Sequence, residues 1–335
     1  LLLIPVPVLA SGVAYEIGSW LPLTVLLIAV VLGLVGANVA NYATEGRQKR
    51  FIKGAFSQYL SPAVIEELMA DPERLRLGGE RRDLSIFFSD IQGFTSISET
   101  LSPEELTALL NEYLSAMTDI IQEEGGTIDK YEGDAIIAFW NAPVGQEDHG
   151  ARSVRAALRC QEQLAEMRPL FRARTRKDLF MRIGLNSGPA VVGNMGSKTR
   201  FDYTMLGDAV NLAARLEGVN KQFGTYTMVS EATRAAAGEE FGYRELSKIR
   251  VVGKNEPVTV YEPLRPSEQE LRSRELQLFD AALHLFYQGS FREARERFAE
   301  LAEADPPAAR YAAKCELLQQ EPPEKWEGLW IMTEK

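Results

Sequence analysis

Two buried-strand patterns, each ending at an aspartate, constrain the fold of this chain most. The short apolar run from Ser85 to Phe88 is followed by Asp90, and a run of this kind predicts a buried strand. Farther along, the β-rich runs Thr127–Glu132 and Ala135–Trp140 are separated only by a glycine and Asp134. This arrangement predicts a hairpin with Asp134 at or beside its tip. Any fold of the chain must therefore place two carboxylates at the ends of strands.

Two carboxylates on neighbouring strands can hold a divalent metal ion over a phosphate group. Carboxylate oxygens suit Mg²⁺ or Mn²⁺, which proteins usually bind through one or two carboxylates together with substrate phosphates. The pattern therefore points to phosphoryl chemistry. The alternative is that Asp90 and Asp134 only cap a strand or a turn, because aspartate is common in turns for its local hydrogen bonds.

A third segment, Arg200 to Glu217, adds two polar residues at helical spacing. After Gly207 the sequence predicts a helix, and Asn211 and Arg215 lie four residues apart within it. Side chains at this spacing share one helix face and can converge on one oxyanion. For an isolated pair, the alternative is an ordinary surface asparagine and arginine.

Together the three segments resemble the class III nucleotidyl cyclases, the adenylate and guanylate cyclases, over roughly residues 81–264. The resemblance implies an α+β sandwich with a ferredoxin-like sheet. It also implies that Asp90 and Asp134 hold two Mg²⁺ or Mn²⁺ ions at each site. Asn211 and Arg215 would then orient the ribose and neutralise the charge that develops on the α-phosphate as pyrophosphate leaves.

The resemblance also implies contacts to the triphosphate. The backbone from Ile91 to Thr95 would donate its N–H groups to the phosphates at the start of a helix. Ile91 would also lie beside the metals, and Phe94 and Thr95 at the substrate. Lys254 resembles the lysine of the family that contacts the triphosphate, and Lys248 lies close enough in the sequence to be an alternative.

Lys130 and Thr204 occupy the positions that read the purine base in the resembled family. A lysine can donate to N1 of adenine and a threonine oxygen can accept from the exocyclic amine, whereas guanine presents a protonated N1 and a carbonyl. The resemblance therefore implies an adenylate cyclase that converts ATP to cyclic AMP and pyrophosphate. A guanylate cyclase and a catalytically silent nucleotide-binding module are the alternatives, and Lys130 alone would also fit a solvated strand.

The N-terminal part of the sequence predicts membrane attachment. Ile17 to Thr44 contains no charged residue and is long enough to cross a bilayer, so residues 1–43 are expected to hold transmembrane helices, the first of them truncated. Basic residues follow at Arg47, Lys49, Arg50 and Lys53. By the positive-inside rule they place the catalytic domain in the cytoplasm, with the chain in the inner membrane.

The remaining segments complete the expected layout. Residues 44–80 read as a linker with a signalling helix, 81–264 as the catalytic domain and 265–335 as a helical extension like a tetratricopeptide repeat. Trp326 and Trp330 indicate that this extension docks on a surface. The layout resembles bacterial adenylate cyclases that carry a CHASE-type sensor.

Charge and composition narrow the partners. The net charge of −10 argues against a nucleic-acid partner, because phosphate backbones are bound through clustered Lys and Arg. Cys160 and Cys315 are far apart in sequence and support neither a disulfide framework nor a zinc site. The resemblance further implies a homodimer whose two sites are each shared between the subunits.

Overall fold

The computed structural model describes residues 5–18, 24–25, 27–36, 78–197, 200–250 and 256–332. The chain divides into two compact units, Leu1–Ile65 and Glu66–Lys335. In the first, helix α1 (Pro5–Glu16) opens on a proline, which is pre-set for the first helical turn. Among the described residues, no helix has both the length and the apolar character that a bilayer crossing needs. Half of the predicted crossing at Ile17–Thr44, and all of the predicted linker except residues 78–80, lie outside the described residues.

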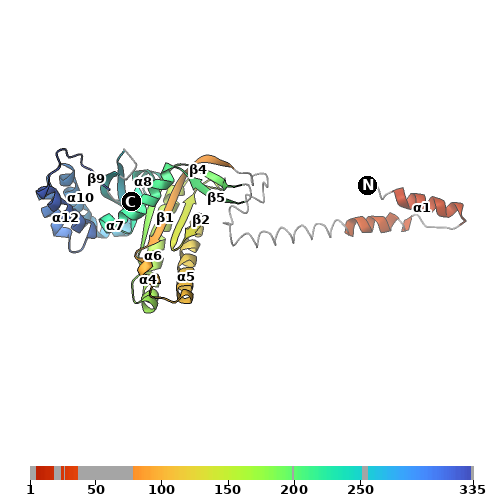
Figure 1. Ribbon diagram of the computed structural model, residues 1–335. Coiled ribbons are helices and arrows are strands. Elements are labelled where there is room, and N and C mark those ends of the chain that lie inside the picture. Colours follow the sequence, from red (N-terminus) through yellow and green to blue (C-terminus); the bar gives the residue numbers. More distant parts are fainter. Residues whose placement is uncertain are drawn as a thin grey trace. The chain divides into compact units, whose positions relative to one another are not determined.

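The second unit is built on a mixed sheet, in which the described residues form nine strands (Figure 1). The strand order is β2-β3-β1-β4-β6-β8-β7-β9, and β5 pairs with β4 beside this path. The strands are β1 (Gly78–Ile91), β2 (Thr127–Glu132), β3 (Ala135–Trp140), β4 (Met181–Gly196), β5 (Phe201–Leu206), β6 (Thr227–Ser230), β7 (Gly242–Arg250), β8 (Val258–Leu264) and β9 (Trp330–Ile331).

Helices cover both faces of the central strands. Phe87 and Ile91 of β1 pack in one core cluster with α5 and α6, whereas Leu84 and Ile86 face α7. Because both faces are buried, β1 reads as a continuous apolar run instead of an alternating one. The helices of this unit are α4 (Phe94–Ser98), α5 (Pro103–Glu123), α6 (His149–Thr175), α7 (Asp208–Phe223), α8 (Glu231–Ala237), α9 (Pro266–Leu271), α10 (Ser273–Tyr287), α11 (Phe291–Leu301) and α12 (Pro306–Gln320). The predicted α+β class is confirmed.

Local sequence signals explain where two of these helices lie. Helix α5 begins with a complete capping box, in which the Glu105 amide donates to Ser102 Oγ and the Ser102 amide donates to Glu105 Oε2 at 2.9 Å. Helix α7 lies directly on β4 at Gly184. A Cβ atom there would stand 2.2 Å from the Glu217 amide nitrogen, so only glycine permits this approach.

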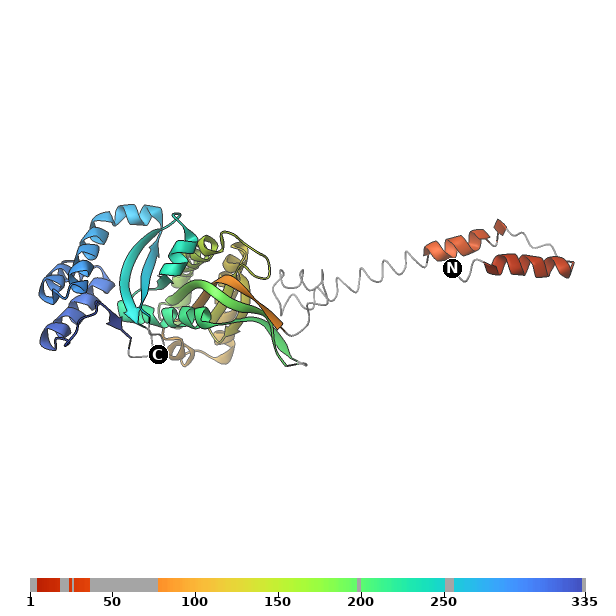
Figure 2. The ribbon, with the colours of Figure 1, turned by 90° about the horizontal axis from the view of Figure 1, so that it is seen from above.

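The C-terminal helices pack on the sheet and do not form a free extension. Figures 1 and 2 show α10 to α12 gathered at one end of the sheet, beside α7. Tyr311 donates from its hydroxyl to the Leu246 carbonyl at 2.7 Å, and the ring of Trp330 lies 4.9 Å from that of Phe223. The predicted docking is confirmed, while the assignment to a tetratricopeptide repeat stays a prediction.

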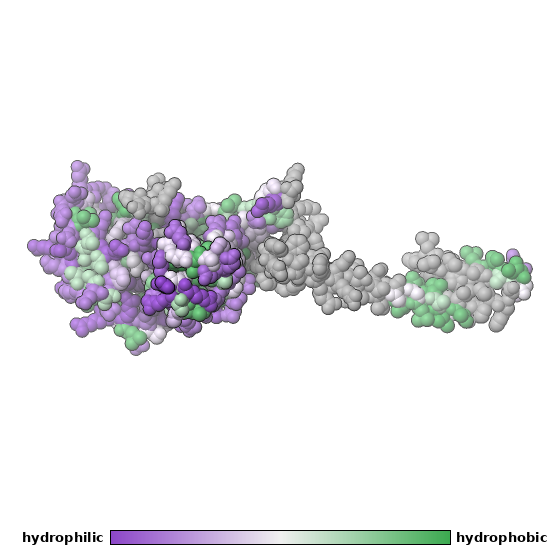
Figure 3. Space-filling view, turned by 60° about the horizontal axis from the view of Figure 1, so that its bottom comes forward, coloured by the Kyte–Doolittle hydropathy of each residue, from purple (hydrophilic) through white to green (hydrophobic). Residues whose placement is uncertain are grey.

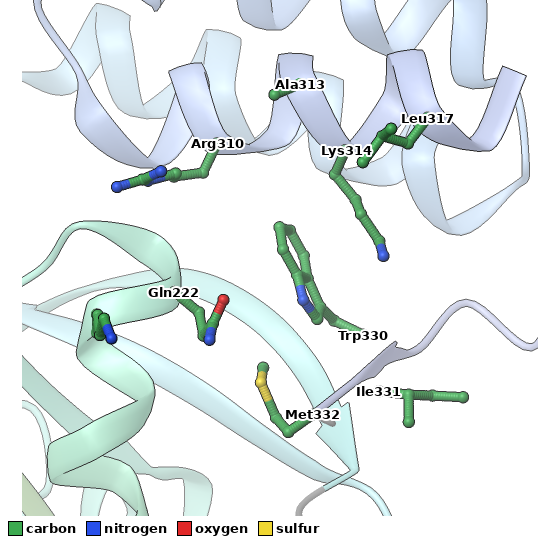
Figure 4. A pocket seen from close by; sticks show the side chains of 9 residues that line it. Gln222, Arg310, Ala313, Lys314, Leu317, Trp330, Ile331 and Met332 are labelled. Carbon is green, nitrogen blue, oxygen red and sulfur yellow. The ribbon is translucent and has the colours of Figure 1, made fainter. Parts of the chain in front are cut away.

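Strand β9 joins the C-terminal segment directly to the sheet, because it pairs in parallel with β7. Figure 4 shows Trp330 between α12 and the C-terminal end of α7. A cavity of about 490 Å³ remains beside it, lined among others by Lys221, Arg310 and Lys314. The core of the catalytic unit and the C-terminal helices thus share one apolar cluster.

Candidate active site

Asp90 and Asp134 meet at one end of the sheet. Asp90 is the penultimate residue of β1, and Asp134 stands in the turn between β2 and β3, next to Gly133 at φ 67°. The Ile91 amide donates to Asp134 Oδ2 at 2.8 Å and ties the turn to the end of β1. The hairpin and the Asp134 position that the sequence predicted are therefore present.

The electrostatics of this pair fit a divalent cation. Asp134 is buried, and burial raises its pKa to about 6, with the like charge of Asp90 adding to the rise and the Ile91 amide opposing it. Two carboxylates with hard oxygen donors suit a cation that shares its remaining positions with phosphate oxygens and water. No cluster of three or more Asp, Glu, His or Cys ligands occurs in the described part of the chain, so Asp90 and Asp134 would bind the ion as a pair.

Two charged residues that the sequence did not predict lie beside Asp90. Arg182 is paired with Asp90 across β1 and β4, and its Nη2 lies 3.3 Å from Asp90 Oδ2. Its Nε donates to Glu217 Oε1 of α7 at 2.9 Å. Burial raises the pKa of Glu217 to about 7, Arg182 opposes this, and Asp90 and Asp134 add to it. Arg182 thus serves as the cation of an otherwise acidic cluster.

The loop after β1 offers fewer backbone donors than the sequence predicted. Of the N–H groups between Ile91 and Thr95, that of Ile91 donates to Asp134 and that of Gln92 donates to the Phe180 carbonyl. Gly93 takes the left-handed conformation, at φ 71°, and α4 starts at Phe94. The first N–H groups of a helix lack intrahelical acceptors, so those of Phe94 and Thr95 have no acceptor within α4, whereas the N–H of Ile91 is already engaged. The roles predicted for Ile91, Phe94 and Thr95 stay predictions.

Lys130 of β2 and Thr204 of β5 come together at the carboxylate of Asp129, although these two strands are not paired in the sheet. The Thr204 hydroxyl of β5 donates to Asp129 Oδ2 at 2.7 Å. Lys130 of β2 places its Nζ 3.6 Å from Asp129 Oδ1. The two residues predicted to read a base are therefore linked through Asp129.

Asn211 and Arg215 lie on α7, separate from the carboxylate pair. Both belong to the predicted helix, with Asn211 exposed and Arg215 half-buried. Within the described parts of the chain, neither side chain forms a hydrogen bond or an ion pair. Among the described residues of the same chain, both groups are thus left without a polar partner.

The predicted triphosphate lysine cannot be placed, since Lys254 lies outside the described residues. The alternative, Lys248, lies on β7 with its Nζ 5.0 Å from the centre of the Tyr287 ring of α10. Lys248 is therefore engaged with the C-terminal helices.

Comparison with known proteins places this site in a family. The model of the adenylate and guanylate cyclase catalytic domain matches residues 79–262. "Adenylate cyclase 1" of Rhizobium meliloti is 38% identical over 182 residues, which cover 54% of this chain and 27% of that protein. "Adenylate cyclase" of Anabaena cylindrica is 35% identical over 221 residues, 64% of this chain and 42% of that protein. The chain thus matches less than half the length of either relative.

Two solved structures agree with this assignment. The guanylyl cyclase Cya2 is 37% identical, with a TM-score of 0.51 and coverage of 56% of this chain and 94% of that chain. The adenylyl cyclase CyaB from P. aeruginosa is 36% identical, with a TM-score of 0.53 and coverage of 56% and 96%. The chain therefore belongs to the family of adenylate and guanylate cyclase catalytic domains.

Proposed function

We propose that this chain is an adenylate cyclase that converts ATP to 3′,5′-cyclic AMP and pyrophosphate. The observation that carries the proposal is the hairpin β2–β3, which brings Asp134 to Asp90 at its tip and Lys130 to Thr204 along its side. In the composite sites proposed below, the tip of the hairpin would serve the metal and phosphates of one site, and Lys130 and Thr204 would serve the purine of the other site. Relatives named as adenylate cyclases support the reaction class.

The choice of base rests on Lys130 and Thr204, because the solved structures of a guanylyl cyclase and of an adenylyl cyclase resemble this chain almost equally. Lys130 can only donate hydrogen bonds, which suits N1 of adenine and opposes the protonated N1 of guanine. A guanylate cyclase is therefore the weaker alternative. A catalytically silent module is weaker still, since Asp90, Asp134, Asn211 and Arg215 are all residues competent for the reaction.

The two carboxylates and the two residues of α7 would have different roles in the reaction. Asp90 and Asp134 would hold Mg²⁺ or Mn²⁺, and such ions, when bound, polarise the attacked phosphate and favour ionisation of the ribose hydroxyl. Asn211 would orient the ribose, and Arg215 would neutralise charge on the α-phosphate. With these roles, no side chain of the protein has to act as general base toward the ribose hydroxyl.

We further propose that the active unit is a homodimer with composite sites. Asn211 and Arg215 have no polar contact with Asp90 or Asp134 within the described chain, which fits a site completed by a second copy. Exposed apolar side chains also surround the hairpin and the β4–β5 ribbon: Tyr131, Val191 and Leu206. A two-fold pair would then carry two equivalent sites.

A separate part of the proposal concerns the membrane. The chain would be attached to the inner membrane, with the catalytic domain in the cytoplasm and a transmembrane signal acting on it. The support for this part is the uncharged sequence Ile17–Thr44 and the basic residues after it. Figure 3 shows apolar surface on the described N-terminal helices, where large apolar side chains are exposed: Leu9, Val13, Tyr15, Ile17, Val25, Ile28, Val31, Leu32 and Val35. Extraction of membranes with alkaline carbonate tests this part, and release of the chain into the supernatant would contradict it.

The test of the catalytic proposal is direct. Purified protein is incubated with ATP or with GTP, each with Mg²⁺ or Mn²⁺, and the cyclic product is identified by mass spectrometry. We expect cyclic AMP and pyrophosphate in equal amounts. Cyclic GMP as the main product would establish the guanylate cyclase alternative, and absence of both products under all four conditions would favour the silent module.

A further inference from the structure

Strand β2 contains an irregularity at the residue between Ile128 and Lys130. Ile128 is paired with Ala138 of β3 and Lys130 with Ile137, so Asp129 is the extra residue of a β-bulge. In a regular strand, neighbouring side chains point to opposite faces. A bulge can redirect a side chain, and here Asp129 and Lys130 form an ion pair with each other while Asp129 also reaches Thr204 on β5.

Asp129 is held by both residues that are proposed to read the base. Its Oδ2 accepts the Thr204 hydroxyl at 2.7 Å, and its Oδ1 lies 3.6 Å from Lys130 Nζ. The side chain of Asp129 is only 3% exposed. Burial raises its pKa, while the hydrogen bond from Thr204 and the charge of Lys130 oppose that rise and favour the carboxylate.

An ionised carboxylate can only accept hydrogen bonds. The hydroxyl of Thr204 has a single hydrogen, and when that hydrogen points to Asp129 only the lone pairs of the oxygen face other groups. Thr204 then presents an acceptor to whatever lies beside it. The exocyclic amine of adenine is a donor and matches this acceptor, whereas the O6 carbonyl of guanine does not.

We propose that Asp129 is a positioning residue that fixes the hydrogen-bond polarity of Thr204 and thereby sets the preference for adenine over guanine. This inference rests on the proposed cyclase function and deepens it. Lys130 and Thr204 would touch the base, and Asp129 would act only through them.

The substitution Asp129→Asn tests this role with little change of shape. Lys130 has only donors, so the amide oxygen of the new side chain should turn to Lys130 and the amide nitrogen to Thr204. Thr204 must then accept from that nitrogen, and its own hydrogen becomes free to donate. A donor at this place suits the guanine carbonyl and leaves the adenine amine facing another donor.

We expect Asp129→Asn to lower the ratio of kcat/KM for ATP to that for GTP by roughly tenfold or more, since a mismatched polar pair at a buried contact is costly. The ratio is measured on one preparation, so a partly unfolded sample does not distort it. Asp202→Asn is the matched control. Asp202 is exposed on β5, two residues before Thr204, and its replacement removes the same charge without touching the Thr204 hydroxyl.

A second measurement separates positioning from a merely structural role. In a Thr204→Val background there is no hydroxyl to orient, so adding Asp129→Asn should leave the ATP:GTP ratio unchanged. Thr204→Ser, which keeps a hydroxyl, should retain the preference of the parent and its sensitivity to Asp129→Asn. Such dependence between two sites is the signature of a shared contact.

The outcomes distinguish this inference from the function on which it rests. If the parent protein makes no cyclic nucleotide, the proposed function fails. If the parent prefers ATP but Asp129→Asn keeps the same ATP:GTP ratio, the positioning role is wrong while the cyclase proposal stands. An equal fall of the ratio in the Asp202→Asn control would also overturn it, because charge alone would then explain the effect.

Discussion

At the scale of single residues, the carboxylate pair carries the strongest prediction. Replacing Asp90 or Asp134 by Ala should lower turnover more than tenfold while the chain stays folded, because bound metal contributes several kcal/mol of transition-state stabilisation. Circular dichroism checks that the variants stay folded, and product analysis measures their turnover. Asp83→Ala is the matched control, since Asp83 is an exposed residue of the same strand. Turnover above a tenth of the parent value in either variant would remove these residues from the metal site.

The same site predicts opposite changes in activity and stability. The pKa of Asp134 is raised from 3.8 to about 6, first by burial, so its ionisation destabilises the folded state without metal. This cost is absent below pH 3.8, grows as the pH rises toward 6 and is then constant. Asp134→Asn keeps an oxygen for the Ile91 amide and should stabilise the metal-free protein by about 1–3 kcal/mol at pH 8 while abolishing activity.

Thermal unfolding in EDTA, compared at pH 8 and pH 4, measures this effect. The stabilisation by Asp134→Asn should be large at pH 8 and nearly vanish at pH 4. A variant less stable than the parent at pH 8 would show that the buried carboxylate is compensated within the chain.

Which residues the sequence could predict depends on where their neighbours come from. Asp90 and Asp134 were predictable because each stands at the end of a local pattern. Arg182, Glu217 and Asp129 were not, since Arg182 meets Asp90 only through the register of β1 on β4 and Asp129 reaches Thr204 through a bulge. Neither a register nor a bulge leaves a local signal in one sequence.

At the scale of elements, the two residues proposed to contact the base come from different strands. Lys130 lies on β2 and Thr204 on β5, so changing both tests whether they act as one surface. The double variant Lys130→Glu with Thr204→Cys should depress use of ATP and raise the relative use of GTP, because the hydrogen-bond pattern shown to the purine is reversed. Competition between the two nucleotides, followed by product ratio, measures the change. An unchanged preference for ATP would show that these residues do not read the base.

The docking of the C-terminal helices predicts a loss of stability on truncating Trp330. Its side chain is buried against Phe223 and Tyr311, and removing a buried aromatic side chain costs about 3–5 kcal/mol. Trp330→Ala should therefore lower the midpoint of chemical unfolding of the whole catalytic unit. Leu317→Ala, at a side chain that is 60% exposed, should change it little. Equal midpoints for the Trp330 variant and the parent would mean that this contact does not stabilise the core.

Elements with a self-contained pattern were predicted well. The strands at Thr127–Glu132 and Ala135–Trp140 appear with the expected bounds. That β9 is a strand of the sheet could not be predicted, because it pairs with β7 and this pairing joins residues about 80 positions apart in the chain. The two tryptophans predicted docking but not the strand.

At the scale of the whole molecule, the proposed dimer makes a prediction that neither copy alone can satisfy. Asp90→Ala and Arg215→Ala should each be inactive. Mixed under conditions that allow subunit exchange, they should recover up to about a quarter of parent activity, since half of the random pairs carry one intact site of two. Exchange is verified with differently tagged copies. A mixture that stays inactive despite exchange would place each site within one chain.

The pairing of β9 with β7 has a consequence for how the protein is made. Residues 330–331 are among the last described residues to leave the ribosome, yet they cover Phe223 of the helix that bears Asn211 and Arg215. Domains generally fold in the order of synthesis, but this apolar cluster lacks Trp330 until about 80 residues beyond β7 have been synthesised. A nascent chain stalled before Trp330 should therefore expose Phe223 to chaperones, and synthesis of strand β9, more than synthesis of the segments that carry Asp90 and Asp134, would set the moment at which this unit completes its fold.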